Sequence, residues 1–298
     1  MLNFKQDVSK HVTEIGGHVS VSGGVHLAVE RAAAIGGNCM QVFSGSPRSW
    51  RRSELKKNDI KKMFANQQEL SVYSIFTHAL YLVNLASNNQ ELVDKSVRSL
   101  IFDLRFDSLV KGSGVVVHLG SHQGRGWDAV KHQLVDIIKR ILQETPQDSM
   151  LLLENSAGQK GKIASDLKEI KWLLDQIKSK RVGWCVDTCH AFAAGYPLVG
   201  SSKYTQNSTK EDLVTVIEDL HLTDSLRCLH VNDSKTKFGS GNDRHANISE
   251  GLIPQSDLKQ FLNNQSLIGI PIITEVPGLD DKGPDQENIE RIKNLVDK

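Results

Sequence analysis

The sequence predicts a single closed (β/α)8 barrel, on three observations. Along its 298 residues, short apolar stretches alternate with longer amphipathic ones, and the pair is repeated eight times. The short stretches are mostly apolar on both faces, which is typical of parallel strands buried on both sides. No Gly-x-Gly-x-x-Gly turn follows the first of them, so an open doubly wound sheet is the less favoured alternative.

The predicted strands are short and bounded by Gly, Asn, Asp or His, residues that commonly stand where a strand ends. In chain order they are Gly17–Ser20, Asn38–Phe43, Val72–Thr77, Gly114–Leu119, Met150–Glu154, Val182–Asp187, Arg227–Val231 and Pro271–Glu275.

The stretches after the strands predict helices, because their apolar residues recur at helical spacing. They are Val25–Ile35, Ser53–Leu70, Gln90–Lys111, Asp128–Gln143, Ala164–Ser179, Thr209–His221, Gln255–Leu262 and Pro284–Val296. The third shows the spacing best, with Leu92, Val93, Val97, Leu100, Ile101 and Leu104 on one side.

The composition is that of an ordinary globular protein, with 39% apolar and 24% charged residues. It excludes collagen-like, low-complexity and strongly disordered chains. No linker rich in Pro, Gly or Ser divides the chain, and the polar segment Val199–Thr209 is expected to be an exposed loop. We therefore expect one domain over residues 1–298, in which residues 1–14 form an extension with no assigned role.

Charge and cysteine content restrict the function classes further. The 36 Lys and Arg residues nearly balance the 35 Asp and Glu residues, so any nucleic-acid binding requires a local basic patch. No apolar stretch is long enough to span a membrane and no secretory signal opens the chain, so an intracellular protein is expected, in the cytoplasm or in whichever compartment holds its substrate. The four cysteines are expected to be reduced core thiols, namely Cys39, Cys185, Cys189 and Cys228.

Histidines and carboxylates gather where the predicted strands end. In an α/β barrel the active site lies at the carboxyl ends of the strands and in the loops that follow. The residues found there are His78, His118, Glu154, Asp187, His190, His230, Asp243, His245 and Glu275. Any one of them alone is most simply a structural residue, but that interpretation would have to hold on six strands independently.

Metal ions account for this set better than structure alone does. Four carboxylates brought together without cations would repel one another and shift each other's pKa values. Imidazole and carboxylate groups are zinc and manganese ligands, and nine candidates exceed the need of one tetrahedral ion, which indicates two or three ions. Such a site suits phosphate-ester hydrolysis. Neither a Gly-x-Ser-x-Gly elbow nor a P-loop is present to offer another nucleophile or phosphate site.

At these residues the sequence resembles the endonuclease IV family of apurinic/apyrimidinic endonucleases. The similarity runs in order from about Ile15 to Pro277. Its most specific segments are Val186-Asp187-Thr188-Cys189-His190 and Leu229-His230-Val231-Asn232-Asp233-Ser234-Lys235. The others are Gly17-His18-Val19-Ser20 with Gly23-Gly24, Gln41-Val42-Phe43, Pro47-Arg48-Ser49-Trp50, His78 to Ala86, His118-Leu119-Gly120-Ser121, Glu154 to Gly158, Ala194-Gly195-Tyr196, Gly239-Ser240 through Asp243-Arg244-His245, and Glu275-Val276-Pro277.

The resemblance implies three zinc ions, which manganese can replace, and a role in base excision repair. By this resemblance His78, His118 and Glu154 hold the first ion. Glu154 bridges to the second, which Asp187, His230 and Glu275 complete. His190, Asp243 and His245 hold the third. Hydrolysis 5′ to a base-less sugar in duplex DNA leaves a 3′-hydroxyl and a 5′-deoxyribose phosphate, with Glu154 and Glu275 orienting or deprotonating the attacking water. Blocked 3′ ends are a second expected substrate, and a monomer is expected.

A local basic patch is present between Arg48 and Lys62, where seven basic residues face two acidic ones. The later lysines are as well explained by a solvated helix face. Arg48 differs because it follows a strand end on the expected active-site face. The resemblance implies that Arg48 and Tyr81 enter the duplex where the damaged nucleotide is expelled, which lowers the cost of flipping.

Two other functions stay open at this point. A metal-dependent sugar isomerase or epimerase also gathers Glu, Asp and His at the strand ends of such a barrel, but it has no evident use for His190, Asp243 and His245. A non-catalytic module that binds damaged DNA would not need all nine ligand types.

Overall fold

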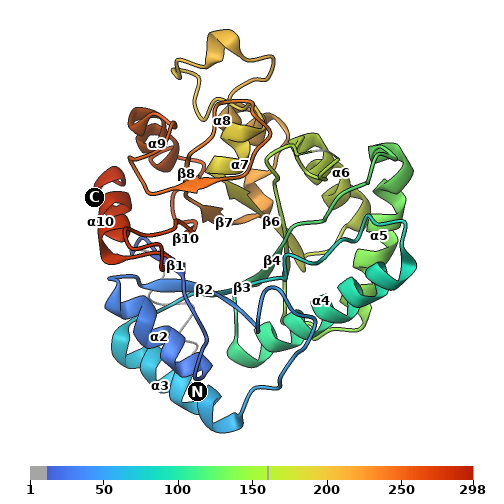
Figure 1. The fold of residues 1–298 in the computed structure, drawn as a ribbon, viewed down its shortest axis with the longest axis vertical. Coiled ribbons are helices and arrows are strands. Elements are labelled where there is room, and N and C mark those ends of the chain that lie inside the picture. The colour runs from blue at the N-terminus through green and yellow to red at the C-terminus, as the bar shows by residue number, and fades with distance from the viewer. Residues whose placement is uncertain (1–11, 160, 298) are drawn as a thin grey trace.

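The computed structural model describes residues 12–159 and 161–297 and confirms the predicted (β/α)8 barrel. Eight parallel strands close in the order β1-β10-β7-β6-β5-β4-β3-β2, and Figure 1 shows the helices arranged around them. The strands are β1 (Ile15–His18), β2 (Cys39–Phe43), β3 (Ile75–His78), β4 (Gly114–Val117), β5 (Leu151–Glu154), β6 (Val182–Asp187), β7 (Leu226–His230) and β10 (Ile272–Thr274).

The outer helices lie where the sequence predicts them, within a few residues at each end. They are α2 (Val25–Ala34), α3 (Lys57–Leu70), α4 (Gln90–Val110), α5 (Trp127–Gln143), α6 (Leu167–Ile177), α8 (Leu213–Asp219), α9 (Gln255–Leu262) and α10 (Gln286–Leu295). Several begin at a side-chain cap: Asn89, Asp166, Asp212 and Asp285 each accept a backbone N–H of the first turn. These caps set the helix starts and hence the lengths of the loops that precede them.

The first strand begins two residues earlier than predicted. Gly16 and Gly17 are poor strand formers, yet both belong to β1 and pair with β10 and β2. A Cβ atom on Gly16 would collide with the carbonyl group of Cys39 on the neighbouring strand. The close approach of the two backbones therefore requires glycine at position 16. With β1 starting at Ile15, His18 is the last residue of the strand.

Four small elements at the carboxyl end of the barrel were not predicted. The six-residue helix α7 (Thr188–Ala193) follows β6 without a loop, and the two-stranded hairpin of β8 (Asp233–Ser234) and β9 (His245–Ala246) follows β7. The segment expected to be an exposed loop contains the short 3-10 helix η1 (Thr205–Asn207) and protrudes at the top of Figure 1. Among the described helices, none combines the length and apolarity that crossing a membrane requires.

The core has two parts. Inside the barrel, a fully buried layer contains Cys39, Phe76, Val116, Leu152, Cys185, Cys228 and Ile273. Larger apolar clusters fill the space between the strands and the helices. All four cysteines are buried and free of disulfides, as expected. The interior layer closes the bottom of the barrel, so the strand ends above it form the floor of a site.

Candidate metal centre

The nine predicted ligands lie together at the carboxyl end of the barrel. Their side chains form neighbouring groups in which the potential ligand atoms are within 4.8 Å of one another. One group is His78, His118 and Glu154, and a second is Glu154, Asp187, His230 and Glu275. In a third, Asp187 lies with His190 and His245, and Asp243 contacts both of these histidines. Strand ends and loops from around the barrel therefore contribute to one centre.

Glu154 occupies the middle of the centre. Its carboxylate is fully buried, and its Oε2 lies 3.3 Å from His78 Nε2 and 3.1 Å from His118 Nε2. Its Oε1 lies 2.9 Å from His230 Nδ1 and 3.5 Å from His190 Nδ1. The two oxygens thus face different histidines, which is the arrangement that a carboxylate bridging two cations needs.

In four of the histidines one ring nitrogen contacts a carbonyl or amide oxygen, which can only accept a hydrogen bond, so that nitrogen carries the proton. His78 Nδ1 donates to the Ala79 carbonyl at 2.7 Å, His190 Nδ1 to the Asn155 carbonyl at 3.1 Å and His245 Nδ1 to the Glu275 carbonyl at 3.4 Å. His230 Nε2 donates to Gln41 Oε1 at 2.9 Å.

In the neutral form of each of these four rings the second nitrogen is therefore unprotonated, and its lone pair points at a carboxylate. Two acceptors cannot share a contact of about 3 Å without a positive charge between them. Either an extra proton or a metal ion must supply that charge, and a histidine whose other nitrogen is held by an oxygen is the usual metal ligand. The donor set therefore fits divalent cations that accept nitrogen and oxygen ligands.

The electrostatics of the cluster indicate the same need for positive charge. Burial alone would lower the pKa of His190, but Asp187 and Asp243 outweigh it and raise the pKa to about 10. Burial is likewise outweighed at His245, whose pKa the same two carboxylates raise to about 9. His118 is the exception, since burial lowers its pKa to about 4 and leaves a neutral ring at neutral pH. The raised pKa values of His190 and His245 mean that protons on these two rings supply the positive charge that the carboxylates need. Metal ions can supply the same charge.

Two residues with no role assigned from the sequence, His18 and Gln41, hold Glu275 in place. Gln41 Nε2 donates to Glu275 Oε1 at 2.6 Å and lies 3.0 Å from His18 Nδ1, which is itself 3.3 Å from Glu275 Oε1. Gln41 also accepts from His230, so one buried amide orients two candidate ligands, one at the end of β7 and one just after β10. The signal for it is a glutamine in the middle of an otherwise apolar strand, Cys-Met-Gln-Val-Phe.

Two asparagines perform a similar task for Asp187. Asn232 Nδ2 donates to Asp187 Oδ2 at 2.6 Å, and its Oδ1 accepts the Glu275 backbone N–H at 2.7 Å. Asn155 Oδ1 accepts the Asp187 backbone N–H at 2.6 Å. Asp187 Oδ1 also caps α7 by accepting the His190 N–H at 2.8 Å. Asp187 is therefore locked in one rotamer, and α7 delivers His190 three residues later.

Backbone and aromatic contacts hold the loop that carries Asp243 against α7. Gly239 N–H donates to the Phe192 carbonyl at 3.1 Å, and Gly241 N–H donates to the Ala193 carbonyl at 2.9 Å. The ring of Phe238 packs edge-on against Phe192 at 5.3 Å between centroids. The third group of ligands is thus assembled by α7 and a loop that lies much later in the chain.

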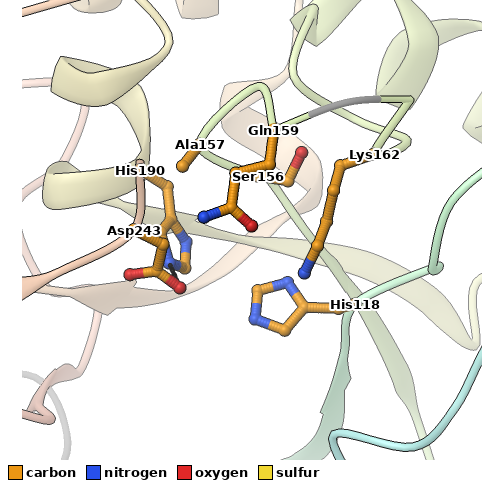
Figure 2. Close-up of a pocket in the computed structure, with 7 residues that line it drawn as sticks. All are labelled: His118, Ser156, Ala157, Gln159, Lys162, His190 and Asp243. Carbon is orange, nitrogen blue, oxygen red and sulfur yellow. Dashed lines mark ion pairs between the residues drawn. The ribbon is translucent and has the colours of Figure 1, made fainter. Parts of the chain in front are cut away.

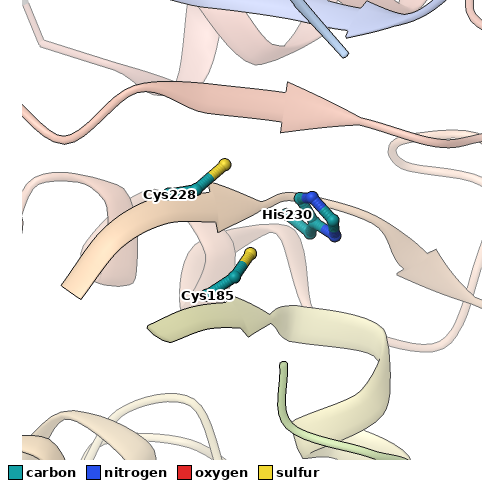
Figure 3. A group of neighbouring side chains, drawn as sticks. All are labelled: Cys185, Cys228 and His230. Atoms are coloured by element: carbon teal, nitrogen blue, oxygen red, sulfur yellow. The ribbon is translucent and has the colours of Figure 1, made fainter. Parts of the chain in front are cut away.

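Cys189 lies near Asp243 and His245, whereas Cys185 and Cys228 lie below the candidate ligands. Figure 3 shows Cys185 and Cys228 on the neighbouring strands β6 and β7, with His230 beyond Cys228 on the same strand. Both sulfurs are close enough to His230 to share an ion with it, but the ring nitrogens of His230 face Glu154 and Gln41. Their packing with Phe76 and Leu152 supports the predicted role as core residues.

Arg48 and Tyr81 lie at the rim of the same barrel end. Arg48 is exposed in the loop after β2. Tyr81 is 60% exposed, and its ring packs edge-on against Phe43 at 5.3 Å between centroids. Arg52, counted in the basic patch, instead turns inward and pairs with the buried Asp103 on α4. Arg51, Lys56, Lys57, Lys61 and Lys62 remain exposed.

Comparison with known proteins identifies the family. The sequence model of the AP endonuclease 2 family, described as a xylose isomerase-like TIM barrel, matches residues 29–295. The chain is 34% identical over 280 residues to the probable endonuclease 4 of Halothermothrix orenii, covering 94% of this chain and 99% of that protein. It is 36% identical over 287 residues to the probable endonuclease 4 of Methanoculleus marisnigri, covering 95% and 98%.

Solved structures agree with this assignment. The crystal structure of endonuclease IV from Thermus thermophilus superposes with a TM-score of 0.80 at 31% identity, covering 95% of this chain and 98% of that one. A D-tagatose 3-epimerase-like protein has a TM-score of 0.65 at 19% identity over 95% of this chain and 97% of its own, a likeness that extends to the fold alone. By sequence and by structure, the chain belongs to the endonuclease IV family of apurinic/apyrimidinic endonucleases.

Proposed function

We propose that this protein is a metal-dependent endonuclease that hydrolyses the phosphodiester 5′ to an abasic site in duplex DNA. The observation that carries the proposal is the convergence of three ligand groups around Glu154, with four histidines whose lone pairs face carboxylates. Phosphate-ester hydrolysis is the reaction that a polynuclear centre of this kind suits. Membership of a DNA-repair nuclease family supports the same substrate.

Zinc is the proposed metal, and three ions are proposed. His78, His118 and Glu154 would hold the first, Glu154, Asp187, His230 and Glu275 the second, and His190, Asp243 and His245 the third. Such ions, when bound, supply Lewis-acid charge for the phosphate oxygens and lower the pKa of a coordinated water. Manganese accepts the same nitrogen and oxygen donors and is the proposed substitute.

The side chains of the protein position the reactants and move the proton. Although burial alone would raise the pKa of Glu275, His230 and His18 lower it below its usual range, so the carboxylate is ionised and can accept the proton of the attacking water. Gln41 and His18 hold Glu275 Oε1, so Oε2, which lies 3.4 Å from His230 Nδ1, is the oxygen that faces the other proposed ligands. A bond forms between the water oxygen and phosphorus, the P–O3′ bond breaks, and the 3′ oxygen takes up a proton.

Incision of a duplex oligonucleotide with one tetrahydrofuran abasic analogue tests the proposal directly. Because the analogue blocks β-elimination, a product with a 3′-hydroxyl end requires hydrolysis. We expect that product, together with about three zinc ions per chain, one for each proposed ligand set. Duplexes with blocked 3′ ends are the second proposed substrate. A metal-loaded protein that binds the duplex without cutting it would favour the binding-module alternative, and ketose isomerisation without cutting would favour a sugar isomerase.

Replacing Gln41 with alanine should weaken metal binding by about 10- to 100-fold, the usual effect of losing a residue that orients ligands. Gln41 contacts no proposed ion, but it holds His230, His18 and Glu275 together. Metal affinity measured by competition with a chromophoric chelator checks this. Gln143→Ala, at an exposed position where α5 ends, is the control and should leave affinity unchanged. Equal affinities in all three proteins would remove Gln41 from this role.

Replacing Arg48 with alanine should reduce selection of abasic over intact duplex by about tenfold, the effect of losing one contact worth about 1.4 kcal/mol. Arg48 is exposed at the rim, so the fold should be unaffected. The measurement is the ratio of dissociation constants for the two duplexes, with Arg51→Ala as the matched exposed control. If the ratio falls equally in both variants, the patch contributes only general charge.

A further inference from the structure

A small pocket opens between the first and third ligand groups. It is lined by His118, Ser156, Ala157, Gln159, Lys162, His190 and Asp243. Figure 2 shows the Lys162 side chain extending into it, with its amine beside the His118 ring and the Gln159 amide directed between His118 and His190. The Lys162 ammonium thus lies in a pocket that three candidate metal ligands also line, namely His118, His190 and Asp243.

Backbone contacts join Gly161, Lys162 and Ile163 to the loop that follows β4. Lys162 forms an isolated antiparallel bridge with Ser121, in the loop that follows His118. On either side, the His122 N–H donates to the Gly161 carbonyl at 2.8 Å and the Ile163 N–H donates to the Gly120 carbonyl at 3.0 Å. The loops after β4 and β5 are therefore tied together, and this tie fixes the point from which the Lys162 side chain reaches the centre.

The donors in this pocket lack acceptors. Among the described residues, none forms an ion pair or hydrogen bond with the Lys162 ammonium, and the Oγ of Ser156, a residue only 3% exposed, has no hydrogen-bond partner there. The one carboxylate lining the pocket, Asp243, already contacts His190 at 3.1 Å and His245 at 3.2 Å. A buried hydroxyl without a partner is costly, and a half-buried ammonium beside it makes the pocket complementary to an anion.

We propose that Lys162 binds a phosphate group of the DNA strand at the metal centre, with Ser156 and Gln159 as the neutral donors of the same subsite. The proposal rests on the proposed function, since a duplex supplies the phosphate. A phosphate placed between the first and third ligand groups brings one of its oxygens within reach of this pocket. Lys162 then adds a protein charge to the negative charge that develops on that phosphate.

The test compares Lys162→Gln with Lys162→Arg, which retains the charge, and with Lys168→Gln, an exposed lysine on α6. For Lys162→Gln we expect kcat/KM on the tetrahydrofuran duplex to fall about 10- to 100-fold. The slope of log kcat/KM against log salt should become shallower by about 0.9, since one phosphate contact is lost. Lys162→Arg should retain most of the wild-type kcat/KM and most of the wild-type salt slope, and Lys168→Gln should match the wild type in both.

Binding of inorganic phosphate to the zinc-loaded proteins, followed by calorimetry, provides a readout independent of cutting. Lys162→Gln should weaken it about tenfold, while the zinc content stays equal to that of the wild type. If the wild type does not cut DNA yet Lys162→Gln weakens phosphate binding, the subsite is upheld and the proposed function fails. Unchanged cutting, salt slope and phosphate binding would overturn the subsite, as would loss of zinc from Lys162→Gln.

Discussion

Replacing Glu154 with glutamine should abolish incision and remove most of the bound metal. Glu154 is fully buried, and its two oxygens face His78 and His118 on one side and His230 on the other. Glutamine has the same shape but no charge, so two of the three proposed ligand groups lose an anion. We expect kcat/KM to fall by about 10³-fold or more, since a charge at the centre of the reaction is removed.

Two measurements separate this effect from misfolding. Metal analysis should give at most one ion per chain for Glu154→Gln, the ion of the third group. Glu211→Gln, on an exposed loop residue, is the matched control and should keep the wild-type rate and metal content. A far-ultraviolet spectrum like that of the wild type would establish that the barrel persists. Full metal content together with near-normal cutting would contradict the bridging role of Glu154.

Strand periodicity was sufficient to predict the barrel, because parallel strands buried on both faces are read directly from short apolar runs. It was least accurate where an element depends on a tertiary contact. The glycines of β1 are in a strand only because a neighbouring backbone approaches them closely. Helix α7 is too short for a periodic pattern and depends on the Asp187 cap. Both features are set by contacts that a local sequence pattern does not reveal.

The site shows the same division. The strand-end position of Glu154, Asp187 and Glu275 was predictable, since carboxylates that end several apolar runs of one barrel have no common structural use. The roles of Gln41 and Lys162 were not, because each depends on which loops close over the barrel end. Only the structure places the Lys162 amine beside His118, which belongs to a different loop of the barrel.

Replacing Arg52 with leucine should destabilise the protein by about 3–5 kcal/mol at pH 8, the usual cost of leaving a buried charge without its partner. Asp103 is fully buried on α4, and its Oδ1 lies 3.1 Å from Arg52 Nη2 and 2.5 Å from Ser44 Oγ. Arg52 Nη2 also donates to Ser99 Oγ at 2.6 Å. These contacts fasten the loop that carries Arg48 to the outer helix, so selection of abasic DNA should weaken as well.

The destabilisation should depend on pH in a defined direction. Burial raises the pKa of Asp103 to about 6, although Arg52 opposes the rise. Because the folded state binds this proton more tightly than the unfolded chain, whose Asp pKa is about 3.9, the contribution of Asp103 to stability falls as the pH rises from about 4 to 6. Without Arg52 the pKa of Asp103 rises further. In the variant the contribution of Asp103 to stability therefore keeps falling above pH 6, whereas in the wild type it no longer changes there.

The difference in unfolding free energy between Arg52→Leu and the wild type should therefore be largest near pH 8 and shrink towards about pH 4, where the Asp103 carboxyl is neutral in both proteins. Urea denaturation of the metal-free proteins at several pH values measures it, and taking the difference cancels the other titrating groups. The double variant Arg52→Leu with Asp103→Asn should regain stability at pH 8, because no buried charge remains unpaired. A difference that does not vary with pH would mean that lost packing of the arginine stem, rather than the unpaired carboxylate, destabilises the variant.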